Sequence, residues 1–121
     1  MKKILIAEDD LQLCKIYKVS LQAAGFEIKI AQDGEEAIAA LSTDFKPDLI
    51  ILDMVMPKKD GYQVLKELKA NPEWVNIPVI VHSNLSQAVE VEEVKAMGIF
   101  DYIVKSDASL KELIDKINSV P

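Results

Sequence analysis

The chain has 121 residues, enough for one domain with a sizeable core and too few for two. Half of the residues are hydrophobic, but the apolar runs are short and flanked by charge, so we expect no membrane-spanning segment and a cytoplasmic protein. Fourteen basic and 20 acidic residues give a net charge of −6 without a basic patch, which argues against nucleic acid as a direct ligand.

Apolar runs rich in β-branched residues predict five short strands. Charged Lys29 interrupts the second run and Asp101 lies inside the fifth, which indicates that these two strands form opposite edges of a sheet. The predicted strands are Lys3–Ala7, Glu27–Ala31, Asp48–Leu52, Pro78–His82 and Phe100–Val104.

Helical periodicity fills the interval after each strand. The first helix ends at Gly25, and the second covers Gly34–Leu41, with Asp33 as its cap and Glu36 completing a capping box. The third and fourth cover Gly61–Ala70 and Ser86–Met97. The last carries Leu110, Leu113, Ile114 and Ile117, with Ser106 or Asp107 as its candidate cap.

The only cysteine, Cys14, excludes a disulfide framework and a zinc cluster of thiolates. It lies in an apolar stripe of the first predicted helix, which we expect to face the core. The thiol should therefore be buried and unreactive. The other members of the stripe are Leu11, Tyr17, Val19, Leu21 and Ala24.

Regular alternation of strand and helix predicts a single α/β domain over residues 1–121, with a doubly wound parallel sheet of five strands and five helices. An eight-fold barrel would need roughly twice this length. In such open sheets, functional groups gather beyond the carboxyl ends of the strands.

Polar residues stand at these strand ends: Glu8-Asp9-Asp10 after the first strand, Asp53 after the third, Ser83 after the fourth and Lys105 after the fifth. Carboxylates meeting there would repel one another unless a cation joined them. Oxygen ligands alone suit a hard ion such as Mg²⁺. A carboxylate beside that ion can attack phosphorus and become an aspartyl phosphate, while a lysine and a hydroxyl stabilise the phosphoryl oxygens.

These motifs resemble, over the whole chain, the receiver domain of bacterial two-component response regulators. The matching segments are 4–10, Pro47–Pro57 running into Asp60-Gly61, Pro78–Ser83 and Asp101–Lys105. The resemblance implies the flavodoxin-like strand order 2-1-3-4-5. It also implies a regulatory phosphoacceptor rather than an enzyme, with only self-catalysed phosphotransfer and dephosphorylation.

By the same resemblance, a histidine kinase or phosphotransfer protein phosphorylates Asp53 in the presence of Mg²⁺. Asp9 and Asp53 would bind the metal directly, Glu8 through water, and Val55 through its backbone carbonyl, whereas Asp10 is not expected to be a ligand.

Further roles carried over by position concern catalysis and switching. Ser83 and Lys105 would act on the phosphoryl group, and Ser83 and Tyr102 would change orientation with it. The output surface would be the fourth helix, fifth strand and fifth helix, read by a downstream protein or an output domain. His82 is left out of the site, because side chains alternate along a strand and Ser83 faces inward.

Several positions depart from the family pattern. Ser106 follows Lys105 where members often have proline after a cis bond, so a trans bond is expected here. Asn84 is larger than the usual residue after the switch hydroxyl. Val55 and Leu85 occupy positions that tune dephosphorylation in the family. Both are apolar and unable to orient an attacking water, which predicts a long-lived aspartyl phosphate.

Three other functions fit less well. A receiver-like interaction module that is not phosphorylated is the main alternative, and the complete acidic site argues against it. A flavodoxin-like cofactor enzyme needs a phosphate-cradling loop where Glu8-Asp9-Asp10 would repel phosphate. A haloacid-dehalogenase-like phosphatase needs a second acid where Val55 stands.

Overall fold

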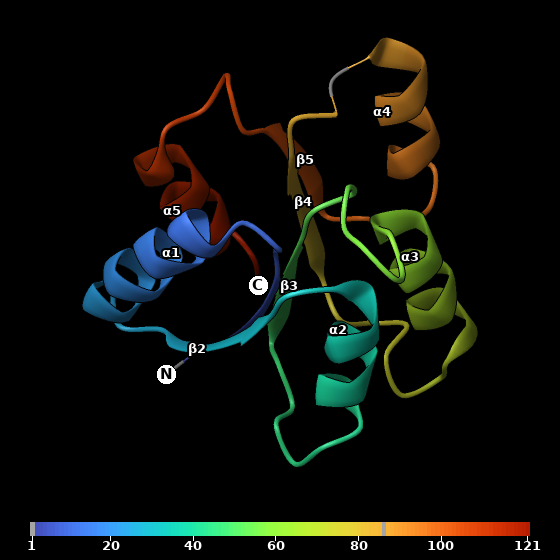
Figure 1. Cartoon of the computed structure of the whole chain (residues 1–121), viewed down its shortest axis with the longest axis horizontal. Coiled ribbons are helices and arrows are strands. Elements are labelled where there is room, and N and C mark those ends of the chain that lie inside the picture. The colour runs from blue at the N-terminus through green and yellow to red at the C-terminus, as the bar shows by residue number, and fades with distance from the viewer. Residues whose placement is uncertain (1, 86) are drawn as a thin grey trace.

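The computed structural model describes residues 2–85 and 87–121, which contain one five-stranded parallel sheet in the order β2-β1-β3-β4-β5 (Figure 1). This order confirms the predicted fold class. The strands are β1 (Lys3–Ala7), β2 (Glu27–Ala31), β3 (Leu49–Leu52), β4 (Val79–Ser83) and β5 (Asp101–Val104). The helices are α1 (Leu11–Ala23), α2 (Gly34–Leu41), α3 (Gly61–Ala70), α4 (Ala88–Lys95) and α5 (Leu110–Asn118).

Helices cover both faces of the sheet, with α1 and α5 on one side and α2, α3 and α4 on the other (Figure 1). Alternate strand residues therefore enter two separate cores. In β1, Ile4 and Ile6 pack on the α1 and α5 side, whereas Leu5 and Ala7 pack on the opposite side. Burial on both faces is the physical reason that the central strands are continuously apolar.

The two edge strands were predicted correctly. Strand β2 is only partly buried over most of its length, and β5 carries a half-buried Asp101. No helix within residues 2–85 and 87–121 combines the length and hydropathy that crossing a bilayer requires.

The stripe predicted for α1 is only partly correct. Cys14, Tyr17 and Leu21 are buried, but Leu11 is 58% exposed and Val19 is 72% exposed. Val19 lies two positions beyond Tyr17, about 200° around the helix, and thus faces outward. Ala24 is also exposed and follows the helix.

The predicted burial of Cys14 is confirmed. Its Sγ donates to the Glu8 carbonyl oxygen at 3.3 Å, and burial raises the pKa of the thiol to about 11. The thiolate, which is the reactive form, is therefore scarce at neutral pH.

Helix caps differ from two predictions. Asp33 caps α2 by accepting from the Glu36 amide at 2.8 Å, but the Glu36 carboxylate accepts from the Gln32 amide instead of closing the box. Ser109 caps α5 through the Glu112 amide at 3.2 Å. The predicted caps Ser106 and Asp107 form the preceding turn instead.

The other helix ends follow simple rules. Asp60 and Gln63 form a reciprocal capping box at the start of α3. Helix α4 is shorter than predicted: it ends at Lys95 and is followed by a turn at residues 96–98. Its predicted first residue, Ser86, lies outside the described residues.

A buried histidine and tyrosine pair joins α1 to β4. Burial lowers the pKa of His82 to about 4 and raises the pKa of Tyr17, so both side chains are neutral at pH 7, and the Tyr17 hydroxyl is hydrogen-bonded to Nδ1 of the imidazole. The two rings are 5.7 Å apart between centroids and tilted by 59°. His82 thus points to the α1 side of the sheet, the face opposite to that of Ser83.

We expect His82 to make the protein less stable in mild acid. Because its folded pKa is depressed, the free energy of unfolding falls as pH drops from about 6.5 towards 4, by roughly 1–3 kcal/mol. His82→Asn removes this titration while keeping a polar group. Urea denaturation of both proteins at pH 7 and pH 4.5 measures the difference. Parallel losses of stability in the two proteins would contradict the assignment.

Candidate functional site

The pairing of the strands brings the predicted site residues to one edge of the sheet. Ala7 of β1 pairs with Leu52 of β3, so the next residues, Glu8 and Asp53, stand beside each other. On the other side, the Lys105 amide donates to the Ser83 carbonyl oxygen at 2.9 Å. Four chain segments therefore meet beyond the strand ends, as the doubly wound topology requires.

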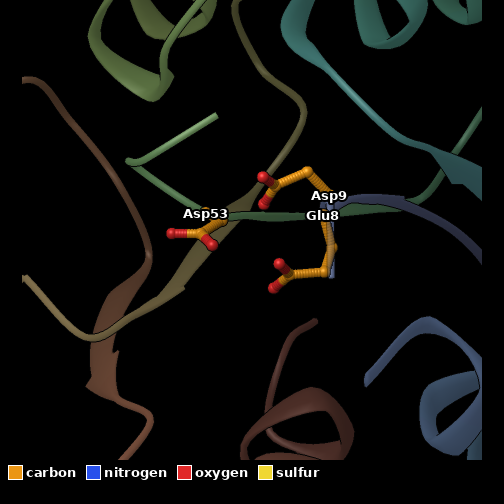
Figure 2. A group of neighbouring side chains, drawn as sticks. All are labelled: Glu8, Asp9 and Asp53. Carbon is orange, nitrogen blue, oxygen red and sulfur yellow. The ribbon is translucent and has the colours of Figure 1, made fainter. Parts of the chain in front are cut away.

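Three carboxylates converge at this edge (Figure 2). Glu8, Asp9 and Asp53 each offer an oxygen, and these oxygens all lie within 4.8 Å of one another. Glu8 is 1% exposed and Asp53 is 6% exposed, whereas Asp9 is open to solvent. A small hard cation forms ligand bonds of about 2.1 Å, so the three carboxylates could bind it together by moving slightly closer to one another.

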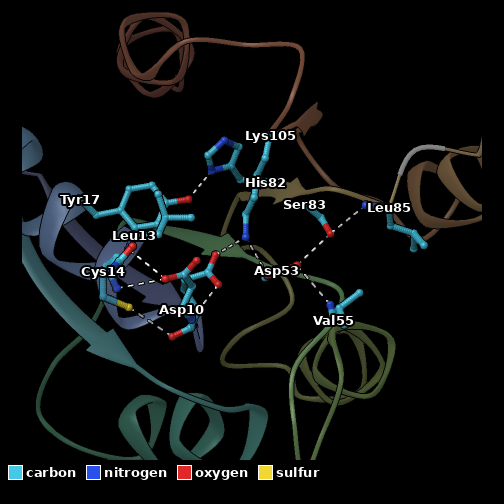
Figure 3. A network of polar contacts seen from close by, with 12 residues as sticks. Asp10, Leu13, Cys14, Tyr17, Asp53, Val55, His82, Ser83, Leu85 and Lys105 are labelled. Atoms are coloured by element: carbon cyan, nitrogen blue, oxygen red, sulfur yellow. Dashed lines mark hydrogen bonds and ion pairs between the residues drawn. The ribbon is translucent and has the colours of Figure 1, made fainter.

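Lys105 bridges the buried carboxylates of Glu8 and Asp53, and Figure 3 labels Lys105 beside Asp53. Its Nζ is 2.5 Å from Glu8 Oε1 and 2.8 Å from Asp53 Oδ2. Burial alone would lower the pKa of Lys105, but hydrogen bonds to Asp53 and Glu8 outweigh it and raise the pKa. The lysine therefore stays charged.

Glu8 is the strained member of this group. Burial raises the pKa of Glu8 to about 7, and the nearby Asp53 charge acts in the same direction, against the opposing contacts of Lys105 and the Asp10 amide. Three carboxylates thus face a single ammonium group. This excess of negative charge is the condition under which a divalent cation binds favourably.

The second oxygen of Asp53 is held by two donors (Figure 3). Ser83 Oγ donates to Asp53 Oδ1 at 2.8 Å, and the Val55 amide donates to the same atom at 3.1 Å. Ser83 is fully buried, so its hydroxyl is fixed against the carboxylate. Together with Lys105, these contacts fix the orientation of the Asp53 side chain.

Hydrogen bonds continue from Ser83 to Tyr102. The Leu85 amide donates to Ser83 Oγ at 3.3 Å, and the Tyr102 hydroxyl donates to the Leu85 carbonyl oxygen. Tyr102 is 9% exposed, and burial raises its pKa. The backbone of Leu85 was missed as a link, because a main-chain carbonyl leaves no signal in the side-chain pattern.

Six of the seven predicted site residues line one cavity of about 400 Å³: Glu8, Asp9, Asp53, Val55, Ser83 and Lys105. Tyr102, the seventh, is not among the lining residues and is linked to Ser83 by hydrogen bonds through Leu85. Val55 is 63% exposed, and Asn84 also lines the cavity.

Two neighbouring features complete the description of the site. The Asp10 side chain caps α1 by accepting from the Gln12 and Leu13 amides at 3.0 and 3.2 Å, and Asp10 also lines the cavity. Among the described residues no peptide bond is cis, so the bond from Lys105 to Ser106 is trans.

Comparison with known proteins identifies relatives over nearly the whole chain. The probable transcriptional regulator ycf27 of Cyanophora paradoxa is 36% identical over 119 residues, covering 98% of this chain and 48% of that protein. The transcriptional regulatory protein CpxR of Klebsiella pneumoniae is 36% identical over 121 residues, covering 99% of this chain and 49% of that protein. The chain thus spans about half the length of these relatives.

A solved structure gives the same result in three dimensions. The Francisella response regulator 1452 receiver domain superimposes with a TM-score of 0.90 at 32% identity, covering 99% of this chain and 96% of that one. The family model of the response regulator receiver domain matches residues 4–118. The chain therefore belongs to the response regulator receiver domain family.

Proposed function

We propose that Asp53 is the phosphoacceptor of this receiver domain, which comprises residues 1–121. The observation that carries the proposal is the Asp53 carboxylate itself, buried at the strand ends with Lys105 2.8 Å from one oxygen and Ser83 2.8 Å from the other. A histidine kinase or a phosphotransfer protein would supply the phosphoryl group from a phosphohistidine.

In this reaction a carboxylate oxygen of Asp53 attacks phosphorus. The new O–P bond forms while the P–N bond to the donor histidine breaks, and the departing nitrogen keeps the electron pair. Lys105 neutralises charge on the phosphoryl oxygens, and Ser83 donates a hydrogen bond to one of them. Both groups already contact Asp53, so little rearrangement is needed.

Mg²⁺ is the cofactor that the donor set supports best. Asp9, Asp53 and the Val55 carbonyl would bind it directly and Glu8 through water, and the ion would supply charge neutralisation between carboxylates and phosphoryl oxygens. The exposure of Asp9 supports entry of a hydrated ion from solvent.

Phosphorylation would be read at a surface remote from Asp53. On phosphorylation, the Ser83 hydroxyl would donate its hydrogen bond to the phosphoryl group in place of Asp53. The hydrogen bonds from Ser83 through Leu85 to Tyr102 would then carry this change to α4, β5 and α5. A downstream protein or an output domain would recognise that face. Cytoplasmic location and the absence of a nucleic-acid ligand remain predictions from composition.

The first test is chemical labelling of Asp53. Asp53→Asn removes the attacking carboxylate, so the variant should take up no phosphoryl group from acetyl phosphate with Mg²⁺ or from a histidine kinase panel, measured by intact mass and phosphotransfer. Asp44→Asn, on an exposed loop, is the matched control and should be labelled like the wild type. An unlabelled wild type would favour the interaction module that is not phosphorylated.

A second test concerns the metal. Asp9→Asn should weaken Mn²⁺ binding, followed by electron paramagnetic resonance of the free ion, by roughly tenfold or more. Asp10→Asn, one residue away, keeps the helix cap and removes only a neighbouring charge, so it should weaken Mn²⁺ binding much less than Asp9→Asn does. Equal affinity of the wild type and the Asp9→Asn variant would exclude Asp9 as a ligand.

The lifetime of the phosphoryl group is the third test. Val55 lines the cavity without a polar group that could orient a water molecule, so phosphate should leave the isolated phosphorylated domain slowly. Val55→Asn introduces such a group and should accelerate the loss, which is measured as phosphate release over time. Complete turnover of the wild type within seconds would contradict this prediction.

A further inference from the structure

The loop after Asp53 rests on the first residue of α2. At Gly34 there is no room for a side chain: a Cβ built there would lie 2.1 Å from the Lys59 carbonyl oxygen and 2.4 Å from the Lys59 Cβ. Real Cβ atoms do not approach other atoms this closely. Gly34 therefore permits a contact between α2 and the loop of residues 54–60 that any other residue would prevent.

Lys58, at the centre of this loop, has a left-handed backbone, with φ of 67°. Lysine adopts this conformation at a cost, so neighbouring contacts must hold it. Its Nζ lies 3.7 Å from Asp33 Oδ2, and Asp33 is the cap of α2. The loop is thus fixed to the start of α2 at two successive residues, Lys58 and Lys59.

The same loop reaches the candidate metal site. Its second residue, Val55, donates its amide hydrogen to Asp53 Oδ1 and lines the cavity. The end of the loop is also tied back, because the Gly61 amide donates to the Met54 carbonyl oxygen at 3.1 Å. A shift at Lys59 is therefore confined to the few residues between these anchors, which include Val55.

Helix α2 is less free to yield than the loop. Ala37, Ala40 and Leu41 are between 1% and 5% exposed and pack in the core on this side of the sheet. Packed cores resist displacement, whereas Pro57 and Lys58 are open to solvent and Lys59 is partly exposed. A side chain at position 34 would thus be accommodated by moving the loop.

We propose that Gly34 is a positioning residue for the metal site: by seating the Lys59 backbone on α2, it sets where the loop presents Val55 beside Asp53. This inference rests on the proposed function, since Val55 is there assigned as a carbonyl ligand. Gly34 itself touches neither the metal nor the phosphoryl group.

The test compares two glycine variants of the full chain by Mn²⁺ titration and thermal unfolding. Gly34→Ala should weaken Mn²⁺ binding roughly tenfold, the size expected for a residue that orients a ligand. Gly25→Ala is the control, because Gly25 has φ of 95° and nothing within 4 Å of a built Cβ. It should lower the melting temperature through backbone strain and leave Mn²⁺ affinity unchanged. Unchanged affinity in Gly34→Ala overturns the proposal.

A second pair of variants tests the loop without altering α2, and decides the question if Gly34→Ala does not fold. Lys58→Pro forbids the left-handed conformation because proline fixes φ near −65°, whereas Lys58→Gly allows it. Both variants lose the ion pair with Asp33. The proposal expects roughly tenfold weaker Mn²⁺ binding in Lys58→Pro only. Equal affinities in the two variants would overturn it.

Failure of the proposed function gives a different result. If the wild type itself binds no Mn²⁺ and Asp53 takes no phosphoryl group, the metal site is wrong and the inference on Gly34 falls with it. If the wild type binds Mn²⁺ and the Gly34→Ala variant binds it equally well, only the role of Gly34 is wrong.

Discussion

The contact of one ammonium group with two buried carboxylates governs this edge of the sheet. Lys105 lies between Glu8 and Asp53, which come from strands that are not neighbours of its own strand. Burying either carboxylate without a partner would cost several kcal/mol. The acids therefore remain inside the protein only while β1, β3 and β5 hold their register, so the chemistry of the site and the arrangement of the sheet depend on each other.

Even with this contact, the site holds more negative than positive charge. A raised pKa at Glu8 means that folding has placed a carboxylate where its charge is poorly compensated by the protein alone. Proteins selected only for stability replace such groups, so retained electrostatic strain points to a ligand that relieves it. The donors and the cavity beside them fit the ligand proposed above, a small divalent cation with phosphoryl oxygens.

Most of the fold could be predicted from the sequence because the period of the apolar residues matches the burial of each strand and helix. Strands buried on both faces are apolar throughout, and acids directly after β1 and β3 must meet once those strands pair. Competition between neighbouring candidate caps explains the error at the start of α5. Several hydroxyl and acidic residues precede α5, and Ser109 rather than Ser106 becomes the cap because the chain first completes a turn.

Other features were missed for different reasons. Val19 was assigned to the buried stripe because it is apolar, although its spacing from Tyr17 places it on the exposed face of α1. The carbonyl of Leu85 and the close approach of Lys59 to Gly34 are backbone contacts, which no side-chain pattern encodes. Pairings between distant charges, such as Lys105 with Glu8, require the three-dimensional register and not only the positions of strand ends.

Two adjacent residues of β4, His82 and Ser83, face opposite sides of the sheet. His82 is bonded to Tyr17 on α1, so the strand end is clamped on that side, whereas Ser83 bonds to Asp53 and Leu85 on the other. A rotation of the serine hydroxyl would break its bonds to Asp53 and Leu85 and leave the contact between His82 and Tyr17 in place. A change at the aspartate would then reach the face of the sheet that carries Leu85 and leave the α1 face unaltered.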